Sequence, residues 1–212
     1  MLETCNDDLL TNAKLMTPAT HLLYLHGFRS SPKSTKARRM ARHVSDRMAQ
    51  GRSITWACPQ LPPSPREAWA LMQEVVAGWP VESMAVVGSS LGGFYATALA
   101  RHLGCRAAFI NPAVAPARDL ARHIGEQTSF HNPADRFFFQ PAFIDEFKAI
   151  DPFPVEAAPH WWLLVAQGDE VLNWEEMVGA YPGCARKVLP GSDHAVSDFE
   201  RHLPDLVQAL AL

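Results

Sequence analysis

The sequence predicts a protein of the α/β class, with a mostly parallel sheet of about five to six strands, helices on both faces and a cap-like insertion. From His21 onward, short apolar runs of β-forming residues alternate with longer stretches whose apolar residues recur at helical spacing. Most of the short runs end in glycine or polar residues, as strands do at the carboxyl edge of a parallel sheet.

The bulk composition is that of a globular protein with one core. The chain has 212 residues, of which 48% are hydrophobic and 19% are charged. We therefore expect a flexible N-terminal tail over 1–20 and a single domain over 21–212. The net charge of −3 provides no general attraction to nucleic acid, which is bound by clustered basic residues.

The sequence also predicts a cytoplasmic protein. No window approaches the roughly 18 uncharged apolar residues of a membrane span. The N-terminal stretch lacks both the basic and the apolar region of a signal peptide. The cysteines are scattered without Cys-x-x-Cys pairs, which fits a reducing compartment. The oligomeric state is left open.

The predicted elements follow one another in βαβ order. The expected strands are residues 22–25, 53–57, 84–87, 106–110, 161–166 and 186–189. The expected helices are residues 33–50, 66–78, 91–103 and the C-terminal segment through Leu210. The first helix places Ala37, Met40 and Val44 at helical intervals. A proline cluster over 59–65 separates the second strand from the second helix.

A segment rich in proline and phenylalanine separates the fourth strand from the fifth. We expect it to form the cap-like insertion, at about 114–159. Its phenylalanines either form a small core of the cap itself or contact a ligand such as an acyl chain.

The motif Gly88-x-Ser90-x-Gly92 lies between a predicted strand and a predicted helix. At such a turn the serine backbone is strained, and its hydroxyl stands above the sheet near the first amides of the helix. Gly88 and Gly92 provide structural support, because larger side chains would clash. The adjacent Ser89 lacks glycine two residues to either side. Ser90 is the predicted nucleophile; the alternative is a loop that ends the sheet or binds an anion.

A serine hydroxyl needs a positioned base, and His194 is the predicted one. It follows the last strand in Gly191-Ser192-Asp193-His194, whereas most other histidines lie in charged helical stretches or in the insertion. A base at this place completes the chain order Ser, Asp, His. The alternative is a histidine that merely forms a turn.

Asp169 is the predicted acid, because it lies just after the fifth strand. It would hold the imidazole and stabilise its charge. Glu170 is the second choice. Asp193 is less suited, since adjacent side chains in a loop point apart. Asp169 could instead cap a helix that begins near Asn173.

Backbone amides are expected to form the oxyanion hole. One is the amide of Leu91, immediately after the nucleophile, and the other is the amide of Phe28, in the loop after the first strand. Gly27 allows close approach of the backbone, and His26 supports the loop by a hydrogen bond. The alternative is a tight turn with a core phenylalanine.

Several short segments carry a family resemblance. They are Tyr24–Phe28, Ser30–Pro32, Lys36-Ala37, Gly88–Phe94, Asn111–Ala113, Gly168–Leu172 and Asp193-His194. Through them the chain resembles the YqiA/YcfP-like esterase family of the α/β-hydrolase superfamily, over nearly everything from residue 21 onward. The first twenty residues, Arg29 and the segment 117–159 depart from the resemblance.

The resemblance implies a compact α/β-hydrolase fold without the superfamily's first strands, and activity on acyl esters or acyl thioesters. Its nucleophile, acid and base fall on Ser90, Asp169 and His194, the residues chosen from their positions. The predicted function is hydrolysis of carboxylic esters through an acyl-enzyme, with a small-molecule substrate and no metal or cofactor.

Other functions stay open. The same triad serves acyl transfer to an alcohol or to peroxide, and a hydrolase scaffold can also act as a ligand-binding protein without catalysis. The basic helix over 33–47 could attract a phosphate-bearing thioester such as acyl-coenzyme A, although a charged helix face is usually just solvated.

Overall fold

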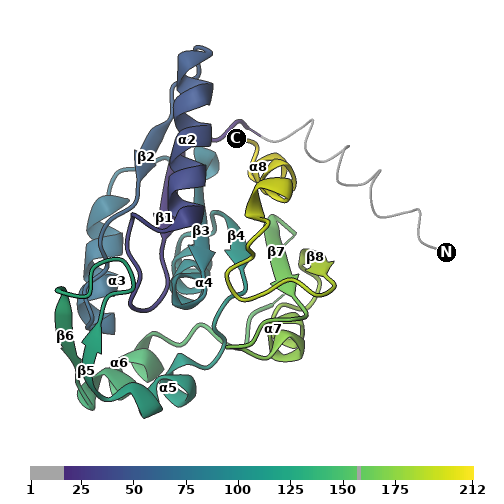
Figure 1. The fold of residues 1–212 in the computed structure, drawn as a ribbon. Helices are drawn as coiled ribbons and strands as arrows, with labels where there is room; N and C mark the ends of the chain where they lie inside the picture. The colour runs from purple at the N-terminus through teal and green to yellow at the C-terminus, as the bar shows by residue number, and fades with distance from the viewer. Residues whose placement is uncertain (1–16, 157–158) are drawn as a thin grey trace.

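The computed structural model describes residues 17–156 and 159–212, and in these residues six strands form one parallel sheet in the order β2-β1-β3-β4-β7-β8 (Figure 1). Because each neighbouring pair is parallel, all carboxyl ends lie at one edge. The strands are β1 (His21–Leu25), β2 (Thr55–Ala57), β3 (Met84–Ser89), β4 (Arg106–Ile110), β7 (Trp161–Ala166) and β8 (Ala185–Leu189). The predicted fold class is confirmed.

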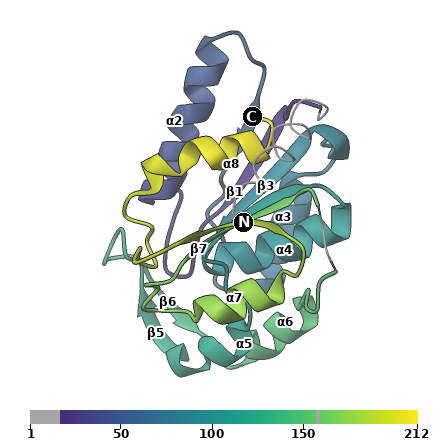
Figure 2. The same ribbon diagram turned by 90° about the vertical axis from the view of Figure 1, so that its right-hand side faces the viewer.

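Helices cover both faces of the sheet (Figure 2). On one face lie α2 and α8, and on the other α3, α4, α6 and α7. The helices are α2 (Thr35–Ala49), α3 (Pro65–Val75), α4 (Leu91–Leu103), α5 (Pro116–Asp119), α6 (Ala142–Ile150), α7 (Trp174–Ala180) and α8 (Leu203–Ala209), with short 3₁₀ turns at Val81–Ser83, Ala121–His123 and Phe199–Arg201.

Side-chain alternation along the strands divides the core between the two faces. In β1, Leu22 and Tyr24 pack with α2, whereas Leu23 and Leu25 pack with α4. Every residue of β3, β4 and β7 is buried. Strands buried on both faces read as continuous apolar runs, which is why these three were recognisable in the sequence.

Local capping sets the helix starts. The Ser34 side chain accepts a hydrogen bond from the Ala37 amide, so α2 begins at Thr35 rather than at residue 33 as expected. Ser64 caps α3 in the same way, followed by a proline at the first helical position. That helix ends at Val75, before Gly78 with its φ of +78°.

The chain between β4 and β7 contains elements that the sequence did not predict. Besides α5 and α6, it forms an antiparallel hairpin of β5 (Gly125–Thr128) and β6 (Arg136–Phe139). Phe139, Phe143 and Phe147 are buried in the main core, where Phe147 lies edge-on to Phe94. The segment thus extends the core of the domain instead of enclosing one of its own.

The chain entering β1 is tied to the sheet. Residues 1–16 of the expected tail lie outside the described residues, but Ala19 is fully buried and its amide donates to Ala211 O at 2.9 Å. Thr20 donates to Ser83 O at 2.8 Å. These two residues, assigned to a flexible tail, are therefore packed. In the described ranges we find no helix that combines the length and apolarity needed to cross a bilayer.

Candidate active site

Ser90 occupies the sharp turn between β3 and α4. Its backbone has φ +57° and ψ −124°, a conformation that is strained for a residue with a side chain. Backbone hydrogen bonds hold it there: the Ser90 amide donates to Ile110 O at 3.0 Å, and its carbonyl accepts from Gly93 at 2.8 Å and Ala113 at 3.0 Å. The neighbouring strand β4 thus fixes the conformation of the turn.

Glycines make this turn sterically possible. A Cβ on Gly88 would overlap Gly92 O, and one on Gly92 would overlap Leu25 O. A Cβ on Gly27 would lie 3.1 Å from Ser90 Cβ. The loop after β1, Ser90 and the first turn of α4 are therefore in direct contact. This close packing is possible because Gly88 and Gly92 have no Cβ.

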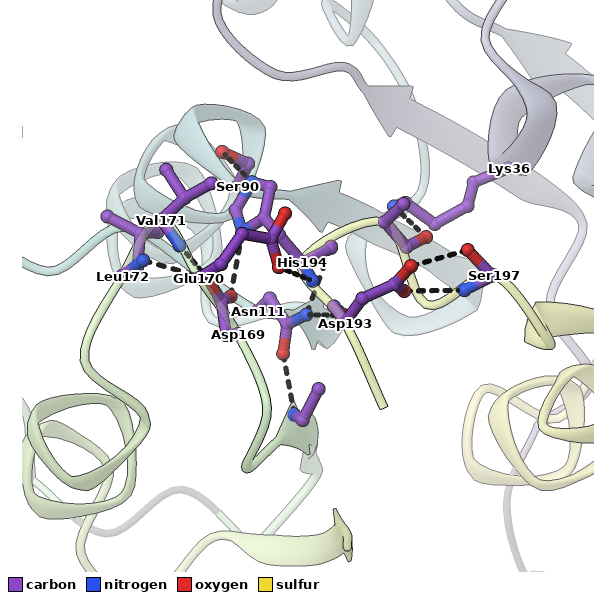
Figure 3. A network of polar contacts seen from close by, with 12 residues as sticks. Lys36, Ser90, Asn111, Asp169, Glu170, Val171, Leu172, Asp193, His194 and Ser197 are labelled. Carbon is purple, nitrogen blue, oxygen red and sulfur yellow. Dashed lines mark hydrogen bonds and ion pairs between the residues drawn. The ribbon is translucent and has the colours of Figure 1, made fainter. Parts of the chain in front are cut away.

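A chain of hydrogen bonds joins Ser90, His194 and Asp169 (Figure 3). His194 Nε2 lies 3.1 Å from Ser90 Oγ, and His194 Nδ1 lies 2.7 Å from Asp169 Oδ2. Because the carboxylate accepts the proton of Nδ1, Nε2 is left to accept the proton of the serine hydroxyl. The geometry is that of a nucleophile, a base and an orienting acid.

The acids near His194 have different partners. The Asp169 carboxylate is fully buried, and its second oxygen accepts the amides of Val171 and Leu172, both at 2.8 Å. Glu170 accepts the backbone amide of His194 at 3.0 Å and does not contact the ring. Asp193 accepts the amide and hydroxyl of Ser197 (Figure 3).

Asp169 does not cap the helix that follows it; another residue occupies the cap position. Asn173 caps α7, and its side chain accepts the Glu175 amide at 2.8 Å. Gly168 lets this loop approach the loop of His194, because a Cβ there would lie 2.5 Å from Ser192 O.

Phe28 and Leu91, the residues expected to supply the oxyanion-hole amides, lie in the two segments that meet at Ser90. Leu91 is the first residue of α4, and Phe28 follows Gly27, whose Cβ would lie 3.5 Å from Ser90 Oγ. Within the described ranges neither amide donates a hydrogen bond, so both remain available to an oxygen bound near Ser90.

His26 holds the loop after β1. Its Nε2 accepts the Leu61 amide at 3.1 Å, and its Nδ1 lies 3.0 Å from Gly27 O. Since Nε2 accepts, the proton is on Nδ1. Burial lowers the pKa of His26, which favours this neutral form.

Asn111 was missed as a site residue, although it occurs in a segment that carried the family resemblance. It follows β4 with φ +42° and is fully buried. Its Oδ1 accepts the Ala166 amide at 2.8 Å, and its Nδ2 donates to Asp193 O at 3.2 Å and His194 O at 3.1 Å. One side chain thus connects the ends of β4 and β7 to the loop of the base (Figure 3).

Lys36, at the start of α2, also reaches the loop of His194. Its Nζ donates to Ala195 O at 2.6 Å. Burial lowers the pKa of Lys36 to about 8, although the nearby carboxylates of Asp193 and Asp169 oppose the change. The sequence indicated only a charged residue on an amphipathic helix.

Arg29 links the loop after β1 to the β5–β6 hairpin. Its Nε donates to Thr128 O at 2.7 Å, and its guanidinium lies 4.4 Å from the centre of the Phe130 ring. The Phe130 amide donates back to Arg29 O at 2.8 Å. Arg29 and the insertion, the parts that depart from the family resemblance, are therefore in contact.

A cleft of about 540 Å³ opens between these loops. Its walls come from the loop after β1, the segment 60–63, the start of α4 and the hairpin. This volume is in the usual range for a small-molecule site. Across residues 17–156 and 159–212, no cluster of three or more His, Cys, Asp or Glu side chains could hold a metal ion.

Comparisons with known proteins give a family and a fold. A family model described as "Uncharacterised protein family (UPF0227)" matches residues 21–211. Among solved structures, the chain is similar to mouse alpha/beta hydrolase domain-containing protein 10, with a TM-score of 0.66, 16% identity and 92% of both chains covered.

Two further structures have the same fold, with similar TM-scores and sequence identities. Est1E from Butyrivibrio proteoclasticus has a TM-score of 0.62 at 15% identity, covering 92% of this chain and 88% of its own. The monoacylglycerol lipase of Paleococcus ferrophilus has a TM-score of 0.62 at 14% identity, covering 92% and 97% respectively.

Proposed function

The chain belongs to UPF0227, the YqiA-like family of the α/β-hydrolase superfamily, and on that premise we propose that it is a serine hydrolase of carboxylic esters. The observation that carries the proposal is the hydrogen-bonded series Ser90, His194 and Asp169, at 3.1 and 2.7 Å. In this proposal Ser90 is the nucleophile, His194 the general base and acid, and Asp169 the group that orients and stabilises the imidazolium.

The first half of the reaction forms an acyl-enzyme. Ser90 Oγ attacks the carbonyl carbon of the ester, and its proton passes to His194 Nε2. The tetrahedral intermediate then collapses: the bond to the alcohol oxygen breaks, and that oxygen takes the proton from His194. The alcohol leaves, and the acyl group stays on Ser90.

The second half regenerates the enzyme. A water molecule gives a proton to His194 Nε2 and attacks the acyl carbon. When the bond to Ser90 Oγ breaks, the proton returns to that oxygen and the carboxylic acid leaves. In both halves the amides of Phe28 and Leu91 would donate to the negative oxygen of the intermediate, each worth about 10²–10³ in rate.

The proposed substrate class includes acyl thioesters, because the same nucleophile attacks both carbonyls. No step requires a metal or a cofactor. Acyl transfer to another acceptor follows the first half-reaction, with an alcohol or peroxide in place of water.

Labelling and turnover test the proposal together. Wild-type protein should react with a fluorophosphonate probe at Ser90, located by peptide mapping, and should hydrolyse p-nitrophenyl butyrate. Ser90→Ala should lose labelling and at least about 10³-fold in kcat, because no second nucleophile is activated. Ser89→Ala is the matched control and should retain both. Full activity in Ser90→Ala would exclude the mechanism, and the absence of both labelling and turnover in wild type would favour a binding protein.

A further inference from the structure

The cleft beside the candidate oxyanion hole is lined by both buried and exposed residues. Leu91, Tyr95 and His26 line it and are 9%, 2% and 4% exposed, respectively. Lys33 and Arg136 also line it and are exposed. The lining therefore combines buried residues at the first turn of α4 with the exposed basic residues Lys33 and Arg136.

The position of the cleft indicates which part of an ester would occupy it. In the proposed mechanism His194 protonates the leaving alcohol, so the alcohol oxygen must lie within hydrogen-bond reach of Nε2. Among the described residues that line the cleft, none comes from the loops 167–172 or 190–198 that carry Asp169 and His194. The cleft therefore fits the acyl part of the substrate, on the other side of the carbonyl carbon.

Part of the lining of the cleft is apolar. Phe28, Leu61, Tyr95 and Phe137 line it, together with Pro62 and Pro63. Burying methylene groups against such a surface is favourable by the hydrophobic effect. An acyl chain of several carbons matches this part of the lining.

The lining has an excess of positive charge. Arg29, Lys33 and Arg136 contribute cationic groups, and Asp135 is the acidic residue of the described lining. Within the described ranges none of the three cations forms an ion pair with a carboxylate. Arg29 is held in place by Thr128 and Phe130, so its charge stays at the wall of the cleft.

We propose that the acyl group hydrolysed at Ser90 ends in a carboxylate, so that the substrate is a dicarboxylic acid esterified at one end. The apolar side chains of the lining would contact the methylene chain. Lys33 and Arg136, the exposed cations that we call the mouth of the cleft, would bind the carboxylate. This inference rests on the proposed esterase function and gives it a substrate class.

A pair of matched esters tests the charge preference. Mono-p-nitrophenyl adipate carries a free carboxylate, and methyl p-nitrophenyl adipate has the same chain without the charge. At low ionic strength, kcat/KM should be about 5–10-fold higher for the charged ester, and the ratio should fall towards one at about 0.5 M salt because the groups at the mouth are screened. A ratio at or below one at low salt, with the neutral ester turned over, would overturn the inference and leave the esterase function standing.

Charge variants distinguish an effect of the cations at the mouth of the cleft from an effect of the net charge of the protein. The double variant Lys33→Gln/Arg136→Gln should bring the ratio of the two kcat/KM values close to one. The control Arg38→Gln/Arg42→Gln changes the net charge equally on exposed positions of α2 outside the cleft, and the ratio should persist. An unchanged ratio in Lys33→Gln/Arg136→Gln would contradict the inference.

Binding to Ser90→Ala gives a readout that is independent of turnover. Monomethyl adipate should bind this variant several-fold more tightly than dimethyl adipate in ligand-observed NMR, and Lys33→Gln/Arg136→Gln in the same background should remove the difference. If this preference is seen but wild type hydrolyses no ester, the cleft assignment holds and the esterase function fails. Equal binding of both ligands would count against the cleft assignment.

Discussion

Several carboxylates lie near His194, and each has a different hydrogen-bond partner. Asp169 contacts the imidazole, whereas Glu170 contacts the backbone of the same residue. Asp193 is bonded to Ser197 and takes no part in the series. Charge alone would make these residues interchangeable, but only a carboxylate on Nδ1 selects the tautomer that leaves Nε2 as a base.

We expect Asp169→Asn to lower kcat by about 10³–10⁴-fold, because an amide at this place favours the wrong tautomer of the imidazole. Glu170→Gln is the isosteric control on the next residue. It should lower kcat less than about 10-fold, since the amide oxygen still accepts the His194 backbone amide. Turnover of p-nitrophenyl butyrate and thermal unfolding of both variants check this. Comparable losses in the two variants would mean that Asp169 has been assigned the wrong role.

The candidate residues Ser90, Asp169 and His194 could be predicted because each lies in the turn or loop that follows a strand, and parallel strands place their carboxyl ends at one edge. Asn111 also follows a strand, yet its side chain contacts partners 55 and 82 residues away in sequence, at the end of β7 and in the loop of His194. Lys36 is similar, because its partner Ala195 is 159 residues distant. Contacts of this kind leave no periodic signal in the chain.

Among the elements, the end of β4 is the junction on which the loops of the base and the acid depend. Asn111 Oδ1 pairs with the last residue of β7, while Nδ2 pairs with two carbonyls of the loop after β8. A buried amide that satisfies partners from two other elements fixes their spacing.

Asn111→Ala should therefore lower kcat by about 10–100-fold with a smaller change in KM. The reason is that the backbone of His194 loses a hydrogen bond, whereas the contacts of the substrate stay the same. The free energy of unfolding should fall by about 2–4 kcal/mol, since buried partners lose their hydrogen bonds. Asn173→Ala, which removes the cap of α7, is the control: it should cost about 1 kcal/mol of stability and leave kcat unchanged. Kinetics and urea unfolding measure both effects, and an unaltered kcat in Asn111→Ala would refute the positioning role.

The insertion was the least predictable part of the fold. The hairpin strands Gly-Glu-Gln-Thr and Arg-Phe-Phe-Phe have no apolar alternation, and short strands without it cannot be recognised from sequence. In α6, by contrast, Phe143, Phe147 and Ile150 are at helical spacing. That spacing is typical of a helix, but it does not show whether the phenylalanines pack into a cap or into the main core.

The molecule as a whole buries thiols that keep their protons. Burial raises the pKa of Cys105 and Cys184 from 9.0 to about 12. Below pH 9 these thiols are protonated in both the folded and the unfolded state. Between pH 9 and 12 the unfolded chain loses the protons and the folded protein keeps them, so stability must fall as pH rises.

We expect the free energy of unfolding to decrease above pH 9, by up to about 1.4 kcal/mol per pH unit for each buried thiol. Urea unfolding at pH 8.5, 9.5 and 10.5 with a reductant would measure the slope, and Cys105→Ala/Cys184→Ala should make it shallower. Lys36 acts in the opposite direction, because its pKa is lowered from 10.5 to about 8: the folded state is neutral where the unfolded state is charged. Lys36→Met should therefore steepen the decline between pH 9 and 10.5, and a shallower decline would contradict this assignment.

The insertion has two parts with unequal freedom to change. Its helix α6 supplies Phe143 and Phe147 to the central core, so deleting it would open the domain. The β5–β6 hairpin pairs only with itself among the described strands, outside the main sheet. New hairpins could be grafted at this place without disturbing the register of the sheet, provided that the graft keeps an acceptor for Arg29 and the core residue Phe139 at the end of β6. The hairpin is thus a wall of the proposed acyl cleft that could vary in sequence, whereas the edge of the sheet that carries the candidate residues is fixed by the core.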